Sequence, residues 1–82
     1  MTKKPDNGIM AEVFRELARA KANRPRWPDH IVACGAIVAE EAGELLRECL
    51  QNKYEDKQNR EAMRKEAIQV IVTAIRFLEN LK

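Results

Sequence analysis

Apolar residues recur at helical spacing in three stretches of the chain. In residues 9–23, apolar and small side chains return every three or four positions, and charged side chains fill the positions between them. The same spacing is found from residue 28 or 29 to about residue 51, and again over about residues 59–81. This periodicity predicts three amphipathic helices.

Two polar segments separate the expected helices. Residues 23–29 contain Pro25 and Pro28, and a residue that precedes a proline avoids helical geometry, so the chain must break there. We expect Pro28 in the first turn of the helix that follows. Residues 52–60 are polar apart from Tyr54 and indicate a solvated connection between two antiparallel helices. The predicted fold is all-α, a small antiparallel helical bundle with three main helices.

The length of 82 residues leaves room for one domain. Residues 1–8 are polar and contain a proline and a glycine, so we predict a flexible N-terminal arm there and a single helical domain over residues 9–82. A chain this short buries a modest fraction of its surface, and we expect oligomerisation to complete the bundle. A second apolar flank on the third helix is the predicted oligomer face. Its members are Ile68, Ile71, Val72 and Ile75.

Charge and composition narrow the partners that the chain is expected to have. The formal net charge is only +2, and basic residues are interleaved with acidic ones, so nucleic acid is not an expected partner. No apolar run approaches the roughly 20 residues that cross a bilayer, so we expect no membrane association and a cytoplasmic location. Cys34 and Cys49 are expected to be free, buried and hydrophobic in character.

Acidic residues occur where helix periodicity predicts core-facing positions. Glu41 falls inside the apolar stripe of the second helix, and Glu44 and Glu48 project from its edge. On the third helix, Glu66 lies at the margin of the apolar stripe, with Gln69 one turn further on. Carboxylates on facing helices repel one another and need a compensating cation, and oxygen ligands suit Mg²⁺ or Mn²⁺. The alternative is that Glu40, Glu44 and Glu48 are solvated helix acids paired with Arg47 or with the lysines of the following connection.

The acidic motifs resemble those of a known enzyme family. Glu40-Glu41-Ala42-Gly43-Glu44, followed by Glu66-Ala67-Ile68-Gln69, resembles the EExxE and ExxD signatures of the MazG-like all-α nucleotide pyrophosphohydrolases, and the resemblance covers about residues 25–80. It implies hydrolysis of a nucleoside or deoxynucleoside triphosphate to the monophosphate and pyrophosphate. It also implies Mg²⁺ or Mn²⁺ as cofactor and a homodimer or homotetramer.

The same resemblance implies roles for individual residues. Glu41, Glu44 and Glu66 would be metal ligands, and Gln69 would stand at the position of the fourth, usually aspartate, ligand. Glu40 would position a ligand or a water, and Glu41 or Glu44 could orient the attacking water. The implied catalytic residues are therefore Glu40, Glu41 and Glu44. The neutral amide of Gln69 departs from the family pattern and predicts weaker metal binding.

Candidate substrate contacts come from residues outside the two motifs. Trp27 and His30 precede the first motif and could contact a nucleobase, whereas Arg26 and Lys53 could meet phosphate oxygens. The alternatives are that Trp27 covers the core and that the basic side chains are ordinary surface charges. The alternative function is a non-catalytic helical oligomeric or adaptor protein that keeps the MazG-like fold.

Overall fold

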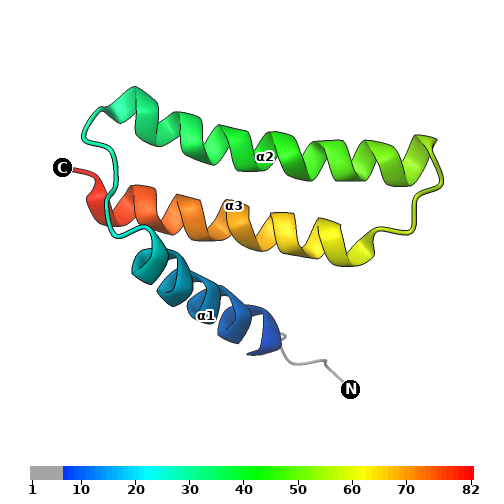
Figure 1. The fold of residues 1–82 in the computed structure, drawn as a ribbon, viewed down its shortest axis with the longest axis horizontal. Helices are drawn as coiled ribbons and strands as arrows, with labels where there is room; N and C mark the ends of the chain where they lie inside the picture. The colour runs from blue at the N-terminus through cyan, green and yellow to red at the C-terminus, as the bar shows by residue number, and fades with distance from the viewer. Residues whose placement is uncertain (1–6) are drawn as a thin grey trace, which may run out of the picture.

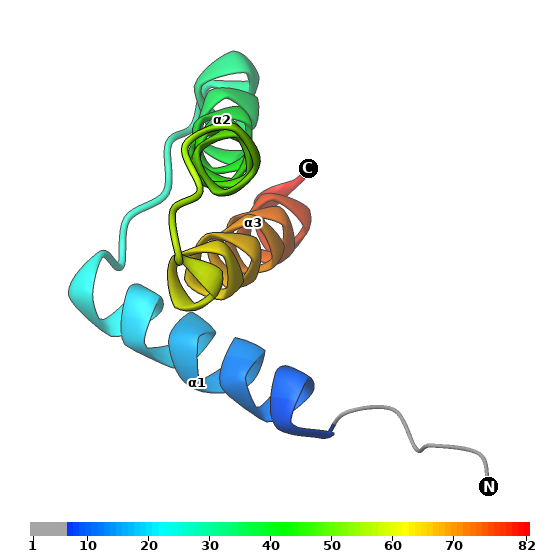
Figure 2. The same cartoon turned by 90° about the vertical axis from the view of Figure 1, so that its right-hand side faces the viewer.

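The computed structural model describes residues 7–82, which form three α-helices. They are α1 (Asn7–Asn23), α2 (Ile31–Tyr54) and α3 (Arg60–Asn80). In Figures 1 and 2, α2 and α3 lie side by side and antiparallel, and α1 crosses the other side of α3. Within residues 7–82, α1 and α2 each pack on α3 and not on one another. The predicted all-α bundle is confirmed, with α3 as its central element.

The helix boundaries differ from the predicted ones by a few residues. α1 begins at Asn7, inside the predicted arm, and residues 1–6 of that arm lie outside the described residues. α2 begins at Ile31 because His30 caps it, with the imidazole Nδ1 accepting a hydrogen bond from the Val32 N–H at 3.2 Å. Pro28 therefore precedes the helix and does not enter its first turn.

A buried asparagine organises the connection between α2 and α3. Asn59, the N-cap residue of α3, is 5% exposed, and its Nδ2 donates to the backbone oxygen of Glu48 at 2.8 Å and to Glu48 Oε1 at 2.7 Å. Asn52 Nδ2 donates in turn to Asn59 Oδ1 at 3.2 Å. Asp56, inside the connection, adopts a positive φ of 50°, which aspartate tolerates better than most residues. These bonds hold the two long helices antiparallel.

The hydrophobic core lies mainly between α1 and α3. Val13 of α1 is fully buried against Ile68 and Val72 of α3. Further apolar side chains pack around this centre, namely Leu17, Ala20 and Ile75. The flank predicted as an oligomer face is therefore largely covered by α1, and of its four members only Ile71 is exposed, at 39%. The prediction was wrong because an apolar stripe does not reveal which element covers it.

The two cysteines have different environments. Both are free, as expected, and Cys34 is buried, with its thiol donating to the backbone oxygen of Pro28 at 3.0 Å. Cys49, however, is exposed, which contradicts the prediction of a second buried thiol. No helix within residues 7–82 is long and apolar enough to cross a membrane.

Candidate functional site

Three carboxyl groups from the two long helices meet where α2 packs on α3, with Glu41 and Glu66 half-buried and Glu44 exposed. Glu41 and Glu44 are one helical turn apart on α2, and Glu66 faces them from α3. One carboxylate oxygen from each residue lies within 4.8 Å of the other two. The structure thus brings together the three acids that the motif resemblance predicted as metal ligands.

Burial and mutual repulsion raise the pKa values of two of these acids. The pKa of Glu66 lies above its ordinary value chiefly because burial disfavours the charged form. Hydrogen bonding with the Glu44 carboxyl and the neighbouring negative charges add to the effect. The pKa of Glu41 is raised mainly by burial and then by the charges of Glu44 and Glu40. The site is therefore short of positive charge.

Glu66 also has an unpaired oxygen atom. Its Oε2 is buried and has no hydrogen-bond partner among the described residues, which is a costly state for a carboxylate. A divalent cation would supply both the missing partner and the missing charge, and a donor set made only of oxygens suits Mg²⁺ or Mn²⁺. Glu41, Glu44 and Glu66 thus fit the metal that the motifs imply.

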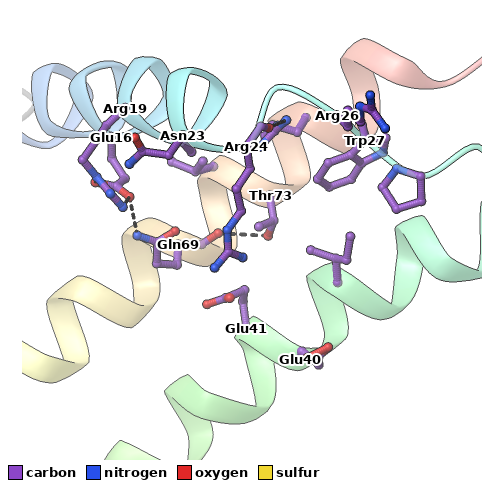
Figure 3. A pocket seen from close by; sticks show the side chains of 15 residues that line it. Glu16, Arg19, Asn23, Arg24, Arg26, Trp27, Glu40, Glu41, Gln69 and Thr73 are labelled. Atoms are coloured by element: carbon purple, nitrogen blue, oxygen red, sulfur yellow. Dashed lines mark hydrogen bonds and ion pairs between the residues drawn. The ribbon is translucent and has the colours of Figure 1, made fainter.

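Gln69, one turn beyond Glu66, has its orientation set by α1. Its Nε2 donates to Glu16 Oε2 at 2.6 Å (Figure 3). Glu16 is itself held by the Arg19 guanidinium, whose Nε donates to Glu16 Oε1 at 2.8 Å, and this contact lowers the pKa of Glu16. Because a carboxylate can only accept, the nitrogen of Gln69 must face Glu16, and its oxygen is the atom left for a ligand. The sequence carries no signal for this contact.

A cavity of about 540 Å³ opens beside the acids, between the three helices and the α1–α2 connection. Glu40, Glu41 and Gln69 line one part of it. Four arginines and an aromatic ring also line it, namely Arg19, Arg24, Arg26, Arg76 and Trp27. In Figure 3, the Arg24 side chain extends from the connection towards Glu41, and its positive charge partly offsets the raised pKa of that acid. Acidic and basic groups therefore share one cavity.

Arg76 is the most buried of these arginines. It is 6% exposed, its Nη2 donates to the backbone oxygen of Arg24 at 2.6 Å, and its guanidinium lies over the Trp27 ring at 5.0 Å. Its Nε is buried without a partner, and no ion pair of residues 7–82 involves it. Sequence analysis missed Arg76. The sequence feature that could have indicated Arg76 is a charged residue at a core-facing position near the end of the last helix.

Of the remaining residues that the sequence predicted for the site, some line this cavity and others lie away from it. Arg26 and Trp27 line the cavity, as does Glu40, which is exposed. His30 is occupied as the cap of α2 and does not line the cavity. Lys53 lies in the last turn of α2, over the Tyr54 ring at 5.5 Å, at the end of the helix far from the cavity. We therefore leave His30 and Lys53 out of the proposed substrate site.

Comparison with known proteins adds no assignment. No family model, curated protein or solved structure matches the chain significantly. The functional argument therefore depends on the residues of the site and on the resemblance of the two motifs.

Proposed function

We propose that this chain is a divalent-metal-dependent nucleoside triphosphate pyrophosphohydrolase of the MazG-like type. The observation that carries the proposal is the convergence of Glu41, Glu44 and Glu66, whose carboxylate oxygens lie within 4.8 Å of one another. A buried, unpartnered oxygen on Glu66 supports it independently of the motif resemblance. The helical bundle that carries these acids agrees with the all-α fold that the resemblance implies.

The proposed chemistry divides between the acids and the arginines. Glu41, Glu44 and Glu66 would hold Mg²⁺ or Mn²⁺, with the oxygen of Gln69 as a weaker fourth ligand. The metal, when bound, offsets charge on phosphate oxygens and makes a bound water more acidic. Exposed Glu40, at the cavity margin, would accept a proton from the attacking water.

The cavity would take the nucleotide beside these acids. Arg24 and Arg26 line it and can donate to phosphate oxygens, which planar guanidinium groups bind well. Trp27 offers an aromatic surface near the same place, which suits a nucleobase. In this proposal, the arginines would bind the phosphates and Trp27 would contact the base.

The decisive experiment measures pyrophosphate release from a panel of ribo- and deoxyribonucleoside triphosphates, with Mg²⁺ or Mn²⁺ and with a chelator. We expect metal-dependent release. Glu41→Gln should reduce the rate by about 100-fold or more, because it removes a charged metal ligand while keeping the shape of the side chain. Glu61→Gln, an equal change at an exposed position of α3 away from the acids, should leave the rate within about two-fold.

Circular dichroism would establish that both variants keep the helical fold. An active Glu41→Gln variant would remove this residue from the proposed site. Silence of the wild-type protein across the whole panel would favour the second candidate, a non-catalytic helical oligomeric or adaptor protein. That candidate has one observation in its favour, because Gln69 places a neutral amide where the motif resemblance expects a charged aspartate ligand.

A further inference from the structure

Arg76 places a buried positive charge beside the cavity without a negative partner. The residue is 6% exposed, and none of the ion pairs in residues 7–82 includes it. Its guanidinium contacts a neutral carbonyl oxygen, that of Arg24, and the face of the Trp27 ring. The buried Nε has no acceptor among residues 7–82. A guanidinium in this state retains both charge and hydrogen-bonding capacity for a further partner.

Structural anchoring alone accounts for only part of this arrangement. The bond to the Arg24 carbonyl and the contact with Trp27 fasten the α1–α2 connection to α3, and a neutral donor would serve that purpose without the desolvation cost of a charge. Arg24 and Arg26 also line the cavity and form no ion pair within the described residues, but both are exposed. Arg76 is therefore the buried guanidinium of this cavity that lacks an acidic partner, and an anion would supply one.

We propose that Arg76 is the buried base of an anion subsite, which binds a phosphate group of the substrate in the cavity beside the acidic triad. The identity of the anion as a nucleotide phosphate rests on the proposed function. The subsite itself rests on the burial, the unpaired charge and the position of Arg76 in the cavity lining. A phosphate bound there would also reach Arg24, whose backbone Arg76 holds and whose side chain extends into the same cavity (Figure 3).

The subsite can be tested without any metal by titrating the full chain with inorganic pyrophosphate in the presence of chelator, using calorimetry. We expect Arg76→Met to weaken binding at least ten-fold, because it keeps the apolar stem and removes the charge. Arg76→Lys should restore part of the affinity, since it keeps the charge but not the planar fork. Arg64→Met, which removes an exposed arginine paired with Glu12, is the matched control and should change the affinity less than two-fold.

A measurement on the wild-type protein keeps the proposal testable if Arg76→Met does not fold. The Nε–Hε resonance of Arg76, identified by its loss in Arg76→Lys, should shift on saturation with pyrophosphate, whereas that of Arg64 should not. An unmoved Arg76 resonance, unchanged affinity in a folded Arg76→Met variant, or no binding by the wild type would each overturn the subsite.

Failure of the subsite and failure of the proposed function are distinguishable. Binding of pyrophosphate that depends on Arg76, in a protein that hydrolyses none of the nucleotides, would support the subsite and reject the hydrolase. Metal-dependent hydrolysis whose KM is unchanged in Arg76→Met would reject the subsite and support the hydrolase.

Discussion

At the scale of single residues, Glu66 is in the least favourable environment of the candidate site. One of its carboxylate oxygens is buried without a partner, and its neighbours Glu41 and Glu44 carry the same charge. Each neighbour therefore increases the free energy of the ionised form of Glu66 in the folded state. In the absence of a cation, this residue should destabilise the fold at neutral pH.

Glu66→Gln should accordingly stabilise the metal-free protein near pH 7. The pKa of Glu66 is raised in the folded state above the ordinary value of 4.5. Between pH 4.5 and the raised pKa, the folded state therefore binds more protons than the unfolded state. The free energy of unfolding therefore falls as the pH rises through this window, and the Glu66 penalty is complete above the folded pKa. Below pH 4.5 both states are protonated and the penalty disappears.

Urea unfolding in chelator at pH 4 and pH 7 would measure this effect. The Glu66→Gln variant should gain stability over the wild type at pH 7, and the gain should shrink or vanish at pH 4. Glu61→Gln controls for the loss of one exposed acid from the same helix and should show no such difference between the two pH values. A Glu66→Gln protein that is less stable than wild type at pH 7 would contradict the assigned environment.

At the scale of the elements, α1 both packs on α3 and positions a residue of the acidic site. Its Val13 closes the small core against Ile68 and Val72, and its Glu16 orients Gln69 at the edge of the acidic site. Two exposed ion pairs also join these helices, Lys21 with Glu79 and Arg64 with Glu12, but such pairs typically contribute less than about 1 kcal/mol each. Apolar packing therefore holds α1 in place.

Shortening Val72 tests this dependence of α1 on packing. Val72 is 1% exposed, so Val72→Ala removes two buried methyl groups and leaves a cavity, which should cost roughly 2 kcal/mol of unfolding free energy. Leu78→Ala removes a larger apolar group at a position of α3 that is 67% exposed, and it should stay within about 0.5 kcal/mol of wild type. Chemical denaturation measures both, and equal losses in the two variants would refute the assignment of the core.

At the scale of the whole molecule, the fold is more open than its length requires. The radius of gyration is 14.5 Å, whereas a compact domain of this length has about 11.7 Å. The face of α2 turned away from α3 is apolar or small along its whole length, and all of its members are exposed. They are Val32, Ala36, Ala39, Gly43, Leu46, Leu50 and Tyr54. A side chain added at Gly43 would meet open space, so packing within the chain does not require a glycine there.

The motif resemblance implies a homo-oligomer, and we expect two copies of the chain to meet through this outer stripe of α2. Light scattering coupled to size-exclusion chromatography should give a mass about twice the 9.4 kDa of one chain. Leu46→Glu, which places a charge in the middle of the stripe, should shift the protein to a monomer. Leu78→Glu, at a residue of α3 that is 67% exposed and outside the stripe, should leave the dimer intact. A monomeric wild type, or a dimer that survives Leu46→Glu, would exclude this interface.

Local patterns in the sequence were enough to predict the three helices and the positions of the acidic residues. Helical periodicity and the prolines between residues 23 and 29 predicted three helices to within a few residues, because the spacing of apolar residues and the geometry of proline are local properties of the chain. The positions of Glu41, Glu44 and Glu66 on facing helices followed from the same periodicity and from the motif resemblance.

The element that covers each apolar helix face could not be predicted from the sequence and was found only in the three-dimensional structure. An apolar stripe indicates that a helix face is buried, but it does not indicate which element buries it. Ile68 and Val72 were therefore predicted to form an oligomer face, whereas α1 of the same chain covers them. The contact of Gln69 with Glu16 and the place of Arg76 in the cavity also depend on how α1 and the α1–α2 connection lie against α3. These contacts join residues more than 50 positions apart, and local periodicity carries no information about pairs at that separation.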